Sequence, residues 1–182
     1  MNLIGNLIIA PPAVKTTFWH KTAIIITEHH HNGSVGLVLN KRSELTIHAF
    51  GQQLGFEINQ PGHLYIGGPV NPQSLSFLHT NEWVSKNTMR INDRFSVSSA
   101  EDILPRMAMG DLPIKWRLFL GMAGWSAGQL IGEIKGIPPW NHNTSWCLCS
   151  ADLDLVFDSD DSDQWCHCLD RSASEFAQNI LA

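Results

Sequence analysis

The chain lacks the basic character of a protein that binds nucleic acid or an anionic membrane surface. It carries 12 Lys and Arg against 17 Asp and Glu, with a formal net charge of -5, and no basic run occurs anywhere. Phosphate groups and anionic headgroups are bound mainly through clustered Lys and Arg. We therefore expect no direct nucleic-acid binding and no membrane association.

A targeting or membrane-spanning segment is also missing from the first residues. Residues 1–10 have no basic segment, and their apolar run is short, interrupted and followed by Pro11-Pro12. A secretion signal needs a basic start before its apolar region, and a spanning helix needs about 20 apolar residues. These features predict a soluble cytoplasmic protein.

Signatures of catalysis are absent too. The sequence has no nucleophile elbow, phosphate-binding loop or dinucleotide fingerprint, and no spacing that indicates a catalytic triad or a carboxylate pair. The acidic run Asp158–Asp163 lacks the glycine and the final glutamate of an EF-hand loop, and carboxylates are favoured before a helix in any case. We expect no cofactor, and we lean against an enzyme.

Cysteine is scarce, and its spacing argues against a metal site. The four cysteines form two Cys-x-Cys pairs, Cys147/Cys149 and Cys166/Cys168. Structural zinc sites favour two to four residues between paired cysteines, whereas free cysteine packs as a small hydrophobic residue. The prediction is that all four are reduced and metal-free. A thiolate cluster that binds zinc, if the two pairs meet, is the alternative.

What the chain does have is the composition of a globular protein. Its 182 residues are 43% hydrophobic and 16% charged, which predicts one domain over residues 1–182 with a substantial core. Strands are predicted at 3–10, 22–28, 35–39, 64–66, 75–79, 89–91, 95–97, 116–123, 145–149 and 153–157. Helices are predicted at 47–54, from Ser98 to Gly110, at 126–136 and at the C-terminus.

The order of these elements predicts an α+β fold with mainly antiparallel pairing. Asn32-Gly33 is a strong hairpin signal between the second and third strands, and no regular βαβ rhythm follows. For the core we predict burial of Phe119, Leu130, Trp165 and Phe176, because of strand alternation and the 3.6-residue helical period.

The most informative segment is 118–134, where an apolar strand meets a helix. Gly121 and Gly124 interrupt the strand before Trp125, and Ser126 with Gln129 has the spacing of a capping box. We expect a sharp corner with Ser126 as N-cap and a positive φ at Gly124.

With other ordered motifs, this segment resembles the YqgE/AlgH family of bacterial proteins. The motifs are Leu7-Ile-Ile-Ala-Pro11, Gly36-Leu-Val-Leu-Asn40, Gly67-Gly-Pro-Val70, Phe119-Leu-Gly121, Ala123-Gly-Trp125 and Gly128-Gln-Leu130 through Glu133. The resemblance implies a bifurcated sheet curled into a pseudo-barrel with flanking helices. It implies no defined chemistry, although the family has carried a label as a transcriptional regulator of alginate synthesis.

Two functional classes follow. The favoured one is a non-catalytic regulatory or interaction-mediating protein, with a protein partner whose identity the sequence leaves open. The alternative is a small-molecule enzyme or ligand sensor with a pocket near Asn40 and Trp125. The candidate ligand or partner surface comprises Asn40, Gly67, Gly68, Trp125, Gln129 and Glu133. A structural interpretation competes with it: Asn40 caps a strand, Gln129 completes a capping box, Glu133 faces water, and the glycines serve a turn.

Overall fold

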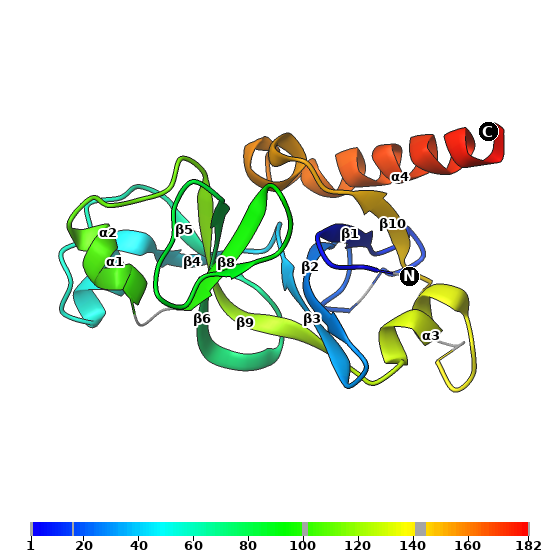
Figure 1. Ribbon diagram of the computed structural model, residues 1–182, viewed down its shortest axis with the longest axis horizontal. Coiled ribbons are helices and arrows are strands. Elements are labelled where there is room, and N and C mark those ends of the chain that lie inside the picture. Colours follow the sequence, from blue (N-terminus) through cyan, green and yellow to red (C-terminus); the bar gives the residue numbers. More distant parts are fainter. Residues whose placement is uncertain (1, 16, 100–101, 141–144, 182) are drawn as a thin grey trace.

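The fold is built on one long sheet whose strands are mostly antiparallel (Figure 1). The computed structural model describes residues 2–15, 17–99, 102–140 and 145–181. Its strands are β1 (Asn6–Ile9), β2 (Ala23–His30), β3 (Gly33–Val38), β4 (Arg42–Thr46), β5 (His63–Ile66), β6 (Val70–Thr80), β7 (Met89–Arg90), β8 (Phe95–Ser99), β9 (Trp116–Ser126) and β10 (Cys147–Ser150). Its α-helices are α1 (Ile47–Gln53), α2 (Ile103–Ala108), α3 (Gln129–Lys135) and α4 (Gln164–Leu181).

Strand β9 joins the two halves of the molecule. The strand order is β10-β1-β2-β3-β9-β6-β8-β7, with β4 paired to β5 and β5 paired in parallel to β9. The first part of β9 lies between β5 and β6, and its last residues, Ala123–Ser126, pair with β3 instead. Figure 1 shows β9 running from the half with α1 and α2 to the half with α3 and α4. The predicted α+β fold, a forked antiparallel sheet curled into a partial barrel in a single domain, is confirmed.

Glycines permit the close backbone crossing at which the sheet forks. A Cβ at Gly67 would lie 2.3 Å from the carbonyl oxygen of Gly121, and one at Gly68 would lie 2.2 Å from the carbonyl carbon of Met122. Gly121 has a φ of +69°, and a Cβ there would lie 2.4 Å from the carbonyl oxygen of Gly68. Because real Cβ atoms cannot approach backbone so closely, only glycine fits at these positions.

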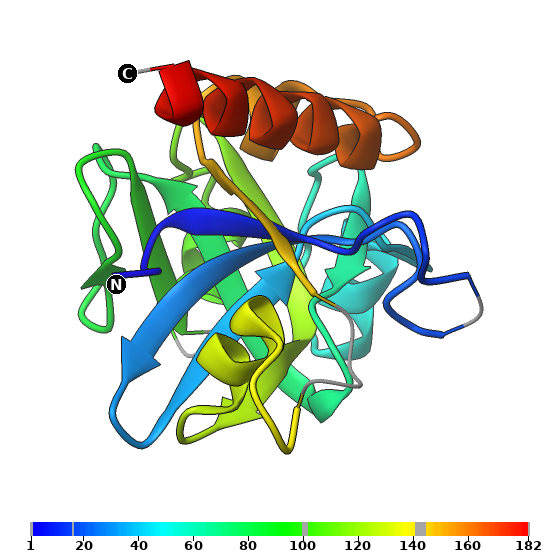
Figure 2. The ribbon, with the colours of Figure 1, turned by 90° about the vertical axis from the view of Figure 1, so that its right-hand side faces the viewer.

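Alternation along the strands divides the apolar residues between faces. On β1 and β2, Leu7, Ile9 and Ile25 face the cluster that contains Trp165 and Cys168 of α4. Ile8 and Ile24 face the opposite cluster, under α3. Figure 2 shows α4 above and α3 below these strands. A third cluster fills the other half, beneath α1 and α2. None of the described helices is long and apolar enough to cross a membrane.

The sequence did not predict β4, and most of the predicted elements lie where the sequence places them, with two exceptions. The Asn32-Gly33 hairpin is confirmed, since His30 pairs with Gly33 across its tip. The strand predicted at 153–157 is wrong: a π-helical turn, η2 (Asp154–Asp158), occupies this segment. The Asp152 carboxylate accepts the Leu155 N–H at 2.8 Å and so favours a helical start.

The helix predicted to start at Ser98, from the capping-box spacing of Ser98 and Glu101, is the second exception. Ser98 lies in β8, and its hydroxyl lies 2.9 Å from Nε2 of the buried His79. Helix α2 instead begins after Asp102. A serine in the alternating apolar and polar run Phe95–Ser99 serves a strand as readily as a cap, so spacing alone misplaced this helix start.

The core predictions are confirmed for all but one residue. Phe119, Leu130 and Trp165 are buried, at 0%, 1% and 9% exposure. The prediction for Phe176 is wrong, because its side chain is 69% exposed. Helix α4 has 18 residues, about 27 Å, and its core contacts come from its first half, through Trp165, Cys168 and Leu169. Its second half extends past β10 (Figure 1).

The glycine crossing gives the first prediction. Gly121→Ala should lower the free energy of unfolding by at least about 2 kcal/mol, because alanine adds both positive-φ strain and a backbone clash. Gly124→Ala should cost less than about 1 kcal/mol, since its Cβ would meet only Val70 Cγ2 at 3.4 Å. Urea titration of both variants measures the difference, and equal losses would contradict the crossing.

The difference in burial between Phe119 of β9 and Phe176 of α4 gives the second prediction. Phe119→Ala should cost about 3–5 kcal/mol, as a large-to-small change in a closed core. Phe176→Ala should change stability by no more than about 0.5 kcal/mol, because the ring is exposed. Thermal and urea unfolding test both, and a large loss for Phe176→Ala would show that the end of α4 is docked.

Candidate functional site

A buried carboxylate holds part of the predicted surface together. Glu133 on α3 is 6% exposed and therefore does not face water. Its Oε2 accepts hydrogen bonds from the indole Nε1 of Trp125 at 3.0 Å and of Trp146 at 2.8 Å. Its Oε1 accepts one from Nε2 of Gln129 at 2.9 Å. These contacts join β9, α3 and the segment that leads into β10.

The corner between β9 and α3 differs from the predicted capping box. Ser126 ends β9, and the N-cap of α3 is Gly128, with a φ of +74°. Gln129 Oε1 accepts from the backbone N–H and the hydroxyl of Ser126, both at 3.0 Å. Of the predicted capping box, only the contacts of the Gln129 side chain back to Ser126 form. The positive φ expected at Gly124 belongs instead to Gly121 and Gly128.

Tryptophan rings fill the space around this carboxylate. Trp19 lies 6.3 Å from Trp125 and 5.8 Å from Trp146, centroid to centroid, and the latter two are 6.2 Å apart. Trp125 and Trp146 are each 7% exposed. The rings pack against one another, as aromatic core residues do. Trp19 and Trp146 were not predicted here, since nothing in their local sequence indicates a contact so distant along the chain.

The other predicted residues lie in separate places. Asn40 caps the start of β2: its Oδ1 accepts the Ala23 N–H at 3.1 Å, and its Nδ2 donates to the Lys21 carbonyl at 2.7 Å. Gly67 and Gly68 belong to the backbone crossing described above. The Gly67 N–H donates to the Leu120 carbonyl at 2.8 Å. Ligand binding by the six candidate residues stays a prediction, and only Trp125, Gln129 and Glu133 are joined by hydrogen bonds.

A second buried charge, Arg117 on β9, was not predicted. It is 6% exposed, and its Nη1 donates to the Leu39 carbonyl at 2.7 Å and to Gln164 Oε1 at 3.2 Å. Its guanidinium lies 4.7 Å from the centroid of the Tyr65 ring. Burial lowers the pKa of Arg117, and the nearby carboxylate of Asp161 partly offsets this lowering. Arg117 therefore ties the start of α4 to β9.

A polar cavity of about 340 Å³ lies beside Arg117. Arg42 Nε contacts Asp161 Oδ2 at 2.6 Å, and the Tyr65 hydroxyl donates to Asp161 Oδ1 at 3.1 Å. Burial raises the pKa of Tyr65, so the phenol stays protonated. Arg42, Arg117 and Tyr65 thus all contact Asp161, while Asp158 of the same lining pairs with Lys115. Such mutual contacts are typical of a structural ion-pair network.

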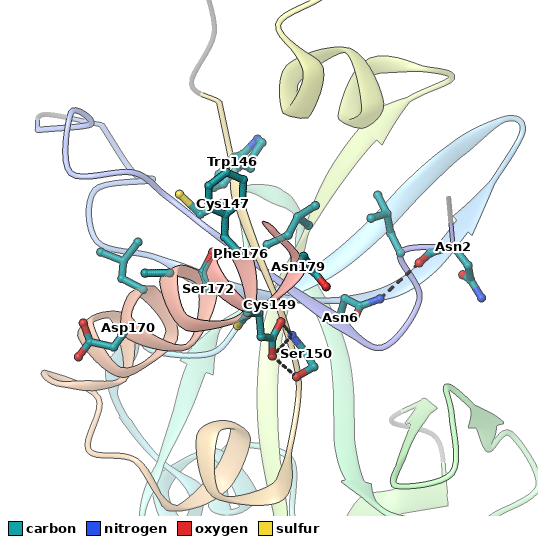
Figure 3. Close-up of a pocket in the computed structure, with 15 residues that line it drawn as sticks. Asn2, Asn6, Trp146, Cys147, Cys149, Ser150, Asp170, Ser172, Phe176 and Asn179 are labelled. Carbon is teal, nitrogen blue, oxygen red and sulfur yellow. Dashed lines mark hydrogen bonds between the residues drawn. The ribbon is translucent and has the colours of Figure 1, made fainter. Parts of the chain in front are cut away.

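A larger groove, of about 830 Å³, lies between β10 and α4. Figure 3 shows α4 residues, among them Ser172 and Phe176, beside Cys149 and Ser150 of β10. None of the six predicted residues lines it. The Glu175 carboxylate accepts the backbone N–H of Ser150 at 3.0 Å and also contacts its hydroxyl. The groove was missed because it depends on where α4 passes the sheet edge.

Two of the four cysteines, Cys149 of β10 and Cys168 of α4, meet between the same two elements. Cys149 and Cys168 are buried free thiols, whereas Cys147 is partly buried and Cys166 is exposed. The pKa of Cys149 is raised, mainly by a hydrogen bond with Cys168 and next by burial. The raised pKa disfavours the reactive thiolate form. Within the described part of the chain, no His, Cys, Asp or Glu residues gather in a group of three that could hold a metal ion. The reduced, metal-free state stays a prediction.

The comparisons with known proteins now identify the family. A model of the AlgH-like family matches residues 7–177, and the chain belongs to this family. It is 34% identical over 157 residues to a UPF0301 protein of Marinomonas sp. (strain MWYL1), covering 84% of this chain and 80% of that protein. It is 30% identical over 173 residues to a UPF0301 protein of Photobacterium profundum, covering 91% and 89%.

Solved structures share the fold. The solution structure of the AlgH protein from Pseudomonas aeruginosa superposes with a TM-score of 0.75 at 29% identity, over 93% of this chain and 88% of that one. The crystal structure of a protein from Corynebacterium diphtheriae gives a TM-score of 0.68 at 25% identity, over 91% and 84%. The predicted family is confirmed, and these comparisons assign no specific function.

The buried carboxylate gives the third prediction. Glu133→Gln should lower the free energy of unfolding by about 1–3 kcal/mol, because the amide cannot accept every hydrogen bond that the carboxylate accepts. Glu44→Gln, an exposed change of the same kind, is the matched control and should be neutral. Urea unfolding followed by tryptophan fluorescence measures both. Equal stability of the two variants would contradict a structural role for Glu133.

Proposed function

We propose that this protein is a non-catalytic cytoplasmic interaction module, which exerts a regulatory role through a protein partner bound in the groove between β10 and α4. The observation that carries the proposal is the 830 Å³ groove beside the end strand of the sheet, with Phe176 exposed at its rim. Large apolar side chains exposed next to a hollow are typical of binding surfaces.

The exposed apolar residues in the second half of α4, which extends past β10, support a role of this half in binding a partner. Phe176 and Ile180 are 69% and 67% exposed, although they continue the apolar stripe that begins with Trp165 and Cys168. Burying exposed apolar area of this kind against a partner is favourable by about 25 cal/mol per Å² before the costs of association. A partner would therefore complete the face that the sheet leaves uncovered.

The alternative functions have less support. A ligand pocket near Asn40 and Trp125 has less support, because among the described residues Trp19, Trp125 and Trp146 pack together and Asn40 caps β2. Direct DNA binding is disfavoured by the net charge of -5. Any regulation of transcription would act through protein contacts.

The fourth prediction tests the groove with peptides selected from a random display library against the full chain. Phe176→Asp should weaken their binding by at least about tenfold, because a charge then lies in the apolar rim. Val84→Asp is the matched control, since Val84 is 64% exposed and lies outside the groove. It should bind as the parent does.

Calorimetry measures these affinities, and thermal unfolding verifies that both variants are folded. A library that yields no binder would contradict the proposal. So would binders whose affinity is the same for Phe176→Asp and the parent chain.

A further inference from the structure

We infer that the groove binds an extended, apolar and basic segment of a partner protein, which adds to the outer edge of β10 as a further strand. This inference rests on the proposed function and deepens it by naming the kind of partner. Three independent features carry it: the direction of the main-chain groups of β10, the position of Glu175, and the charge of the groove lining.

The pairing of β1 shows which groups of β10 face outward. The Ala10 N–H donates to the Thr22 carbonyl, so Ala10 points its main-chain groups toward β2. Ile8, two residues earlier, does the same, because the direction of these groups alternates along a strand. Leu7 and Ile9 therefore point toward β10, opposite Cys149 and Cys147. By the same alternation, Leu148 and Ser150 direct their N–H and C=O groups away from β1. β10 ends the strand order, so among the described strands none pairs with this edge.

Glu175 marks where an added strand would bond. Its carboxylate accepts the outward N–H of Ser150 at 3.0 Å, the position that a carbonyl of a neighbouring strand would take. A charged side chain over an edge strand also discourages indiscriminate pairing. The edge is thus partly covered at Ser150, whereas Leu148, whose main-chain groups face outward by alternation, is among the residues that line the groove. Strand addition at such an edge is a common mode of peptide recognition.

The lining of the groove sets the chemistry of the segment. Among the described residues that line it, the charged ones are Asp170 and Glu175, and none is Lys or Arg. The nearby Arg171 instead pairs with Asp152, at 2.8 Å. Apolar contacts come from the following residues: Leu3, Trp146, Cys147, Leu148, Leu169 and Phe176. A strand whose side chains alternate between apolar and basic would meet both features, because successive side chains point to opposite faces.

A second copy of this chain fits the groove less well. Pairing β10 with its own copy about a twofold axis would bring Asp170 and Glu175 of both copies to one interface, because such an interface uses the same patch twice. Like charges brought together at an interface are unfavourable. We therefore commit to a partner of complementary charge.

The fifth prediction uses synthetic peptides as probes of the full chain. A short, end-blocked peptide of alternating Val and Lys should bind at least about tenfold more tightly than one of alternating Val and Glu. N-methylation of every second amide, on the edge that faces β10, should weaken the Val-Lys peptide by a similar factor, because it removes main-chain donors without removing charge. Calorimetry measures all three peptides.

Variants separate the charge contribution from general destabilisation. Asp170→Asn should weaken the Val-Lys peptide severalfold and reduce the salt dependence of binding. Glu57→Gln, which also removes one negative charge but lies on an exposed segment outside the groove, should have no effect. Hydrogen exchange of the main-chain amide of Leu148, measured by NMR, should slow in the complex with the Val-Lys peptide. It should stay unchanged with the N-methylated peptide.

The outcomes distinguish this inference from the function on which it rests. If library peptides depend on Phe176 but the Val-Lys peptide does not bind, the groove is an interaction site and the strand-addition inference is wrong. Equal binding of the N-methylated peptide would also overturn strand addition. Sedimentation that shows a dimer of the peptide-free chain, dissociated by Phe176→Asp, would assign the groove to a second copy.

Discussion

The fold depends on the close backbone contact between Gly67–Gly68 and Gly121–Met122. Side chains are excluded there, since even a Cβ would lie 2.2–2.4 Å from the opposing backbone atoms. The contact lets β9 leave β5 and take β3 as its next neighbour within a few residues. One strand thereby serves both halves of the molecule, and the sheet curls around it instead of extending flat.

Buried charges then fix the last third of the chain against β9. Arg117 binds the carbonyl of Leu39 and the side chain of Gln164 at the start of α4. Glu133 binds Trp125 of β9 and Trp146 just before β10. A buried charge that lost these partners would be costly, so each contact fixes the position of the segment that supplies the partner. Together they place β10 and α4 side by side, and the groove follows from that placement.

Much of the fold could be predicted from local sequence. The Asn32-Gly33 hairpin, the apolar strands and the burial of Phe119 follow from turn chemistry and strand alternation. The positive φ at Gly121 rather than at Gly124 could not, because only the approach of Gly68 distinguishes two glycines in one strand. Likewise, the period of α4 marks Phe176 as core-facing, but the helix continues past the edge of the sheet that would cover it.

The candidate site was predictable only in part, for a related reason. The spacing of Gln129 and Glu133 places both on one face of a helix, and the structure joins them by a hydrogen bond. Their partner Trp146 lies beyond the helix, and the groove itself combines β10 with a helix that starts 14 residues after β10 ends. Such sites depend on packing between elements, which no local pattern encodes.

The most direct measurement is a crystal structure of the full chain with the tightest-binding peptide selected from the library. The account predicts an extended peptide beside β10, with its main chain bonded to Leu148 and its basic side chains near Asp170 and Glu175. A peptide bound as a helix, or bound over Trp125 and Asn40, would contradict it.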